Sequence, residues 1–150
     1  MESHLFLFEA GQWIGEGRVK FSASPEQIKF YTKWTIPAAT GDENPIIRCT
    51  QQVEMQGSSE QVVNNFQLSN ISNGSFAIQI ENDLVGKVQG KGVTDAKTIA
   101  WEFRGHPGFE GFEVYELTDN GDYMLHAEYS SPDQFRTIID GRIWKKLVST

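Results

Sequence analysis

The sequence lacks several features that would place it in an easily recognised class of protein. It contains one cysteine in 150 residues, which excludes a disulfide framework and a metal site built from several thiolates. It is also poor in basic residues, with 13 Lys and Arg against 20 Asp and Glu and a net charge of −7. Because nucleic-acid binding depends on clustered basic side chains, this balance argues against a nucleic-acid partner.

Long apolar runs are lacking as well. The apolar run near the start covers only Leu5–Phe8 and is followed by Glu9, whereas a secretory signal has about 7–15 apolar residues after a basic start. No stretch approaches the roughly 20 apolar residues of a membrane-spanning helix. We therefore expect a cytoplasmic protein without a membrane partner.

What the sequence does contain is a regular alternation of apolar and polar residues. Hydrophobic residues make up 39% of the chain and aromatic residues 12%, which is enough for a folded core. Segments rich in Val, Ile, Thr and aromatic residues have a period of two, which is typical of antiparallel strands with one buried face. These expected strands are residues 12–21, 27–36, 46–55, 60–68, 75–81, 84–93, 97–104, 111–117, 122–129 and 135–146.

Turn residues separate the expected strands. Asn73-Gly74 and Asn120-Gly121 are examples, and Asn-Gly is a strong hairpin signal. A helical period is missing, so we allow at most a short helical turn near residues 3–10 or 24–26. A long run of hairpins removes its exposed edges by closing on itself. We predict an all-β fold, a single antiparallel up-and-down barrel of about eight to ten strands that forms one domain over residues 1–150.

Two short motifs lie at the two ends of this strand pattern. Gly11-Gln12-Trp13 opens the first expected strand, and Gly141-Arg142-Ile143-Trp144 lies on the last. This arrangement resembles the calycin superfamily of lipocalins, fatty-acid-binding proteins and related small barrels, in which a late basic residue packs over the Trp of a Gly-x-Trp motif. The resemblance implies a lipocalin-like barrel whose floor is closed by Trp13, with Arg142 or Lys145 stacked on its ring.

The sequence departs from the better-known members of that superfamily. Extracellular lipocalins carry an export signal and a disulfide, and nitrobindin-like barrels have a late His that binds haem, whereas no His follows His126 here. Fatty-acid-binding proteins have two helices between their first two strands, for which residues 22–26 are too few. The resemblance therefore implies a small, lidless intracellular barrel of unassigned role.

The inward-facing residues of the expected barrel predict a cavity for a ligand. Barrels of this size leave room for side chains or for one small ligand, and ligand cavities are mainly apolar. We expect non-enzymatic binding of a small apolar or aromatic molecule, without a cofactor. The expected contact residues are Phe30, Trp34, Phe66, Ile78, Trp101 and Phe103.

The hairpin around Asn120-Gly121 predicts one polar residue inside the cavity. If these two residues form the turn, Glu113 lies opposite Glu128, and such a like-charge pair is tolerated only in water. Glu116 then points into the barrel and His126 points out. We expect Glu116 either to bind a polar group of the ligand or to lie at the barrel mouth in solvent.

Two other functions remain open. A small lipocalin-fold enzyme of the decarboxylase or isomerase type would use Glu116 as an interior acid with Tyr31, Tyr115 or Arg104. A protein-interaction module would instead have a barrel filled by its own side chains. Such a module would bind a basic protein, or a second copy of the chain to form a homodimer, near the acidic stretch 105–134.

Motifs for catalysis and metal binding are otherwise weak. His4, His106 and His126 lack the spacing of zinc ligands, and no Gly-x-Ser-x-Gly nucleophile motif is present. Cys49 lies within an expected strand, where a cysteine most often acts as a small apolar residue. The sequence therefore predicts neither a metal site nor a recognisable catalytic set.

Overall fold

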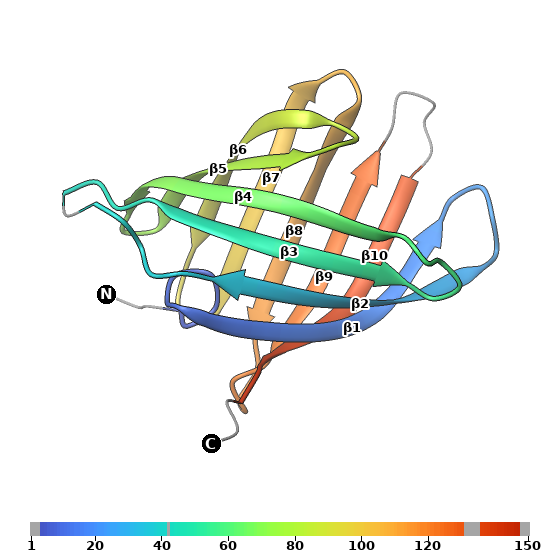
Figure 1. Ribbon diagram of the computed structural model, residues 1–150, viewed down its shortest axis with the longest axis horizontal. Helices are drawn as coiled ribbons and strands as arrows, with labels where there is room; N and C mark the ends of the chain where they lie inside the picture. Colours follow the sequence, from blue (N-terminus) through green and yellow to red (C-terminus); the bar gives the residue numbers. More distant parts are fainter. Residues whose placement is uncertain (1–3, 42, 131–135, 148–150) are drawn as a thin grey trace.

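The protein forms a closed ring of ten antiparallel strands in the computed structural model, which describes residues 4–41, 43–130 and 136–147 (Figure 1). Each strand pairs with its neighbours in the chain, and the first pairs with the last. The strands are β1 (Gly11–Phe21), β2 (Gln27–Ile36), β3 (Ile47–Met55), β4 (Gln61–Ser72), β5 (Ser75–Asn82), β6 (Gly86–Thr94), β7 (Thr98–His106), β8 (Phe109–Leu117), β9 (Tyr123–Ser130) and β10 (Arg136–Lys145). The predicted all-β barrel is confirmed. A search of the described residues for a helix able to cross a membrane finds none.

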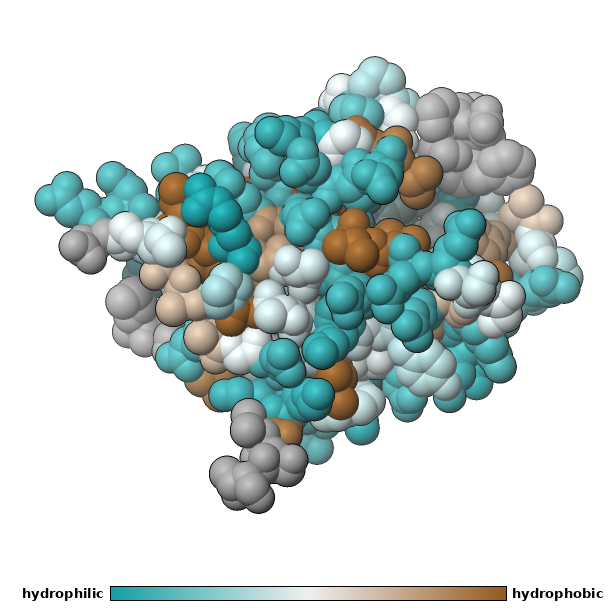
Figure 2. Space-filling view, in the orientation of Figure 1, coloured by the Kyte–Doolittle hydropathy of each residue, from teal (hydrophilic) through white to brown (hydrophobic). Residues whose placement is uncertain are grey.

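The alternation read from the sequence decides which side chains face the barrel interior. In β2, Phe30, Trp34 and Ile36 are buried, whereas Tyr31 and Thr35 between them are exposed. Successive side chains of a strand point to opposite faces, so closing the sheet gathers one apolar face inside. On the face that Figure 2 shows, the surface is mainly hydrophilic, with hydrophobic side chains between the polar ones.

The two ends of the barrel are built differently. The end that carries the β6–β7 and β8–β9 turns also receives the N-terminal segment, residues 4–10, and we call it the plugged end. The opposite end carries the β1–β2, β3–β4, β5–β6 and β7–β8 turns, and we call it the open end. Because every strand runs between the two ends, each contributes residues to both.

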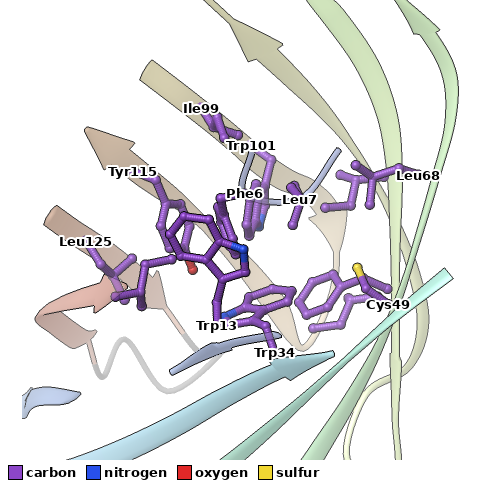
Figure 3. Packing of buried hydrophobic residues seen from close by; sticks show 14 of the residues in the cluster. Phe6, Leu7, Trp13, Trp34, Cys49, Leu68, Ile99, Trp101, Tyr115 and Leu125 are labelled. Carbon is purple, nitrogen blue, oxygen red and sulfur yellow. The ribbon is translucent and has the colours of Figure 1, made fainter. Parts of the chain in front are cut away.

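The N-terminal segment closes the plugged end by inserting side chains into the barrel interior. Phe6 and Leu7 are fully buried, and the Phe6 ring lies 5.3 Å from the rings of Trp13 and Trp34 and 5.1 Å from that of Tyr115. Figure 3 shows Phe6 in the midst of these aromatic side chains. The segment consists of turns and not of a regular helix.

A histidine fixes this segment to the strands. His4 Nδ1 lies 2.6 Å from the hydroxyl of Tyr123, and its Nε2 lies 2.7 Å from the carbonyl oxygen of Asp95. A carbonyl only accepts hydrogen bonds, so Nε2 carries the proton and Nδ1 accepts the proton of Tyr123. Burial raises the pKa of Tyr123 to about 12, which keeps its hydroxyl protonated for this bond.

The implied stacking of Arg142 on Trp13 is wrong. The guanidinium of Arg142 lies over the ring of Trp144, 5.2 Å from its centroid, and the Arg142 side chain is half exposed. Trp13 is buried and is covered by Phe6 and by Tyr123, whose ring centroid is 5.6 Å away. Arg142 is two residues from Trp144 on the same strand, so both point outward.

Candidate ligand cavity

A cavity of about 320 Å³ occupies the open end of the barrel. This volume falls within the range of roughly 300–1,000 Å³ that is usual for small-molecule sites. Leu84, which is 85% exposed, is one of the lining residues. The other apolar lining residues are Val19, Phe30, Val53, Met55, Val62, Ile80, Phe109, Leu125 and Ile139. The polar and charged lining residues are Gln51, Asn64, Asn82, Glu113, Tyr129 and Thr137.

Among the described residues, Glu113 is the one carboxyl group that lines this cavity, and it is only 8% exposed. The hydroxyl of Tyr115 donates a hydrogen bond of 2.7 Å to Oε1, and the hydroxyl of Tyr129 donates one to Oε2. Burial raises the pKa of Glu113, and the hydrogen bonds from Tyr129 and Tyr115 offset part of that rise. The carboxyl is therefore a buried acid with phenolic partners inside a cavity.

Tyr129 is held in position by three neighbours. Its ring stacks on Phe109 with centroids 5.0 Å apart, and its hydroxyl bonds to Glu113. The third neighbour is Gly111, where an added Cβ would lie 2.4 Å from Cδ1 of Tyr129 and 2.3 Å from the carbonyl oxygen of Glu128. Only glycine leaves space for the ring at this point. Burial raises the pKa of Tyr129 well above its usual value, so its hydroxyl stays protonated and donates.

A layer of stacked aromatic rings separates the cavity from the plugged end. Trp101 stacks on Tyr115 with centroids 5.0 Å apart, and Trp34 stacks on Phe66 at 5.1 Å. Within the described part of the chain, the indole N–H groups of Trp34 and Trp101 have no acceptor in hydrogen-bond geometry. The Trp101 indole nevertheless lies near enough to Glu113 to lower the pKa of that carboxyl.

Amide side chains form a second polar group on the opposite wall. Asn82 Nδ2 donates to Asn64 Oδ1 at 2.9 Å, Asn64 Nδ2 donates to Gln51 Oε1 at 3.0 Å, and Gln51 Nε2 donates to Thr32 Oγ1 at 3.1 Å. Gln51 lies on β3 and Glu113 on β8, five strands apart in either direction around the ring. The cavity thus has a carboxyl–phenol wall and an amide wall facing each other.

A comparison with solved structures places this barrel in a known fold. The structure of the S-type phycobiliprotein lyase CPES from Guillardia theta matches with a TM-score of 0.71 over 93% of this chain and 89% of that chain. The protein has a lipocalin-like barrel fold. The two sequences are 8% identical, so the likeness concerns the fold alone. No family model matches the sequence, and a search of curated proteins finds no match.

The barrel places the predicted contact residues at different depths. Phe30 lines the cavity. Trp34, Phe66, Ile78, Trp101 and Phe103 face inward and are buried, as the alternation predicted, but none of them lines the cavity. Trp34, Phe66, Ile78 and Trp101 pack in the core toward the plugged end, where Phe6 fills space that the sequence left open for a ligand. Phe103 lies nearer the open end, with its ring 5.3 Å from that of the cavity residue Phe109.

The predicted inward orientation of Glu116 is wrong. Glu116 is exposed, and Glu113 on the same strand is the inward acid. The cause is the turn between β8 and β9, in which Thr118 N donates to the carbonyl of Asp122 and Gly121 has a φ of 91°. The loop is therefore three residues long, one more than the predicted two-residue turn. The register shifts by one residue, so every side chain of β8 lies on the face opposite to the predicted one.

The structure also places the histidines His106 and His126. His126 points out, as predicted, and its two ring nitrogens contact Asp140 at 2.6 Å and Glu128 at 3.0 Å. Hydrogen bonds to these two carboxylates raise the pKa of His126. His106 accepts from the backbone N–H of Gly108 in the β7–β8 turn. Across the described ranges, no group of three or more His, Cys, Asp or Glu is arranged to hold a metal ion.

Proposed function

We propose that the protein binds a small, mainly apolar molecule in the cavity at the open end of the barrel. The observation that carries this proposal is the cavity of about 320 Å³ with an apolar lining and a buried carboxyl, Glu113, bonded to two tyrosines. Burial of apolar surface would supply most of the binding free energy, at about 25 cal/mol per Å². The polar groups on the two walls would fix the orientation of the ligand.

The fold gives general support to this proposal. A phycobiliprotein lyase has the same barrel, so a ligand-related role is compatible with this architecture. The chemistry of the ligand follows from the lining residues of this chain. Phe30 stays among the expected contacts, and Leu125, Ile139 and Glu113 join it because they line the same cavity.

The direct test is titration with Prodan, an uncharged naphthalene dye whose emission shifts to the blue in an apolar site. We expect saturable binding with a blue shift. Val62→Trp, which adds a large ring to the cavity wall, should abolish it. Val63→Trp is the matched control, because Val63 is the next residue of β4 but is 41% exposed on the outer face. Unchanged binding to the Val62→Trp variant would place the dye elsewhere and contradict the proposal.

A second candidate function is proton transfer. An interior acid with a phenolic partner around a common cavity is the arrangement expected of an enzyme, and Glu113 with Tyr129 has this arrangement. The raised pKa of a buried carboxyl makes its ionised form a stronger base. Catalysis would therefore use Glu113 in place of the predicted Glu116.

Nitrobenzisoxazole is a suitable probe for this candidate. A base removes its carbon-bound proton, the N–O bond breaks, and a coloured cyano-nitrophenolate forms. If Glu113 is the base, wild-type protein accelerates the reaction and Glu113→Gln does not, whereas Glu116→Gln keeps the wild-type rate. Equal rates in the wild type and the Glu113→Gln variant would exclude Glu113 as a base toward this probe.

Other expectations stay predictions. The acidic stretch 105–134 predicts a basic protein or a second copy of the chain as partner, which size-exclusion chromatography with light scattering would detect. The cytoplasmic location is likewise a prediction, to be checked by fractionation of the natural host.

A further inference from the structure

The cavity contains a carboxyl group and no basic side chain. None of the Lys, Arg and His residues of the chain lines it. The residues outside the described ranges, 1–3, 42, 131–135 and 148–150, contain no Lys, Arg or His. No ion pair of Glu113 is found among the described residues. The carboxyl therefore has hydrogen-bond donors around it but no cation.

A buried carboxylate without a cation is an unstable arrangement. Removing the charge from water costs free energy, which is recovered only through a proton, a cation or several hydrogen bonds. Tyr115 and Tyr129 each donate a hydrogen bond to a different oxygen of Glu113, which is the pattern that an ionised carboxylate accepts. Each oxygen retains a further lone pair, and the residue lines the cavity, so a ligand can reach it.

We propose that the ligand is an organic cation, an aromatic or aliphatic body carrying a protonated amine whose N–H groups donate to the Glu113 carboxylate. This inference rests on the proposed function, because it assumes that the cavity binds a ligand. The ammonium group supplies the positive charge that the lining lacks. Hydrogen bonds between an ammonium and a carboxylate are stronger than those between neutral groups, and more so in an apolar cavity.

Two further features of the molecule fit this ligand class. The net charge of −7 attracts cations and repels anions on approach. On the amide wall, the Nδ2 of Asn64 and the Nε2 of Gln51 each use one N–H in the hydrogen bonds among the described residues and have a second N–H to donate. These groups can donate to a carbonyl, ether or hydroxyl oxygen at the far end of the amine. Carboxylate ligands such as fatty acids would instead meet Glu113 without a compensating cation.

The test uses three probes that share one apolar body: naphthylmethylamine, naphthylmethanol and naphthoate, which are cationic, neutral and anionic at neutral pH. Isothermal titration calorimetry measures the affinity of each. We expect the amine to bind about 10- to 100-fold more tightly than the alcohol, the range of a charge-assisted hydrogen bond. We expect naphthoate to bind more weakly than the alcohol. An amine that binds no better than the alcohol overturns the cation proposal.

A pair of variants assigns the preference to one carboxyl. Glu113→Gln keeps the size of the side chain and should lower the affinity for the amine to that for the alcohol. Glu116→Gln removes the same charge from the exposed face of β8 and should leave the preference unchanged. If the preference for the amine persists in Glu113→Gln, it arises from the general negative charge of the protein, and the proposal fails.

The pH dependence of the wild type provides a test that needs no variant. Burial raises the pKa of Glu113, and the titratable groups facing it are Tyr115 on its own strand and Tyr129 on β9, whose pKa values burial also raises. Both phenols therefore stay neutral. Affinity for naphthylmethylamine should rise as the carboxyl ionises, and affinity for naphthylmethanol should not. A flat profile for the amine contradicts a role for Glu113.

The outcomes separate this inference from the proposed function. Binding of Prodan and naphthylmethanol without a preference for the amine leaves ligand binding in place and removes the cation. If neither Prodan nor any naphthyl probe binds, the proposed function fails, and the inference fails with it.

Discussion

The plugged end and the open end of the barrel are made by the same ten strands, yet they differ in what fills them. At the plugged end, Phe6 enters from the N-terminal segment and contacts Trp13, Trp34, Tyr115 and Tyr123. At the open end, mainly aliphatic side chains, three aromatic ones and a few polar groups surround a cavity. One half of the interior is packed with rings, and the other half leaves space.

This difference indicates how stability and function are divided along the barrel axis. Dense packing of large rings stabilises the closed sheet, because each buried aromatic side chain removes a large apolar area from water. The open end gives up part of that packing and places Glu113 where a solvated carboxyl would be more stable. The two halves meet at Tyr115, which contacts Phe6 on one side and bonds to Glu113 on the other.

The largest expected effect comes from removing the plug. Phe6→Ala leaves a cavity among the four rings that Phe6 contacts and should lower the free energy of unfolding by about 3–5 kcal/mol. Leu5→Ala is the control, because Leu5 is 50% exposed and should change it by less than about 0.5 kcal/mol. Urea unfolding measures both. A loss below about 1 kcal/mol for Phe6→Ala would mean that the segment does not plug the barrel in solution.

A second prediction compares the two ends along one strand. Ile78 and Ile80 both face inward from β5, but only Ile80 lines the cavity. Ile78→Phe should destabilise the protein by about 1–3 kcal/mol through overpacking. Ile80→Phe has space to occupy and should cost less than about 1 kcal/mol while weakening Prodan binding. Equal costs at the two positions, measured by urea unfolding, would remove the distinction between a filled and an open end.

A smaller effect is expected from the hydrogen bond that anchors the N-terminal segment. Tyr123→Phe leaves Nδ1 of His4 buried without its donor, which should cost about 1–2 kcal/mol. Because the cavity is at the other end, Prodan binding should stay at the wild-type level. A variant that keeps its stability but loses Prodan binding would show that the two ends are not separate.

The smallest effect concerns pH, and here the variant is expected to be more stable than the wild type, whereas the variants above are expected to be less stable. A carboxyl whose pKa is raised on folding keeps its proton in the folded protein at pH values where the unfolded chain has lost it. The folded state then binds more protons, so the free energy of unfolding falls as pH rises between the unfolded and the folded pKa of Glu113. Glu113→Gln should remove this decline and be more stable than the wild type above that window.

Thermal unfolding of the wild type, Glu113→Gln and Glu116→Gln across the pH range measures this contribution. The Glu116→Gln variant should keep the wild-type decline, because it retains Glu113 and changes only an exposed residue of the same strand. Parallel curves for Glu113→Gln and the wild type would indicate that burial does not raise the pKa of Glu113.

Much of the barrel was predictable because its signal is local. The alternation in β2, with Phe30, Thr32 and Trp34 on one face, identifies both the strand and its inward side. The same alternation places Leu125, Ala127 and Tyr129 on the inner face of β9. Pairing of chain neighbours through short turns then leaves ring closure as the way to remove the exposed edges.

The candidate site was less predictable because it depends on register and on a distant segment. The predicted faces of β8 are reversed in the structure, because the β8–β9 turn is one residue longer than predicted. Glu113 therefore faces inward in place of Glu116. The αL glycine of a three-residue loop, Gly121, was the available signal for the correct register. Nothing local in Leu5–Phe8 indicates that Phe6 would fill the half of the barrel where a ligand was expected.

The most direct test of the account is to locate a bound probe within the barrel. Amide proton–nitrogen correlation spectra, recorded during titration with naphthylmethylamine, report on the backbone N–H groups of all residues except the prolines. The account predicts the largest shifts at cavity residues such as Val53, Val62 and Ile80, with small changes at Phe6 and Ile99 in the plugged half. Shifts concentrated around Phe6 and Ile99, or spread over the outer surface, would contradict a ligand cavity at the open end.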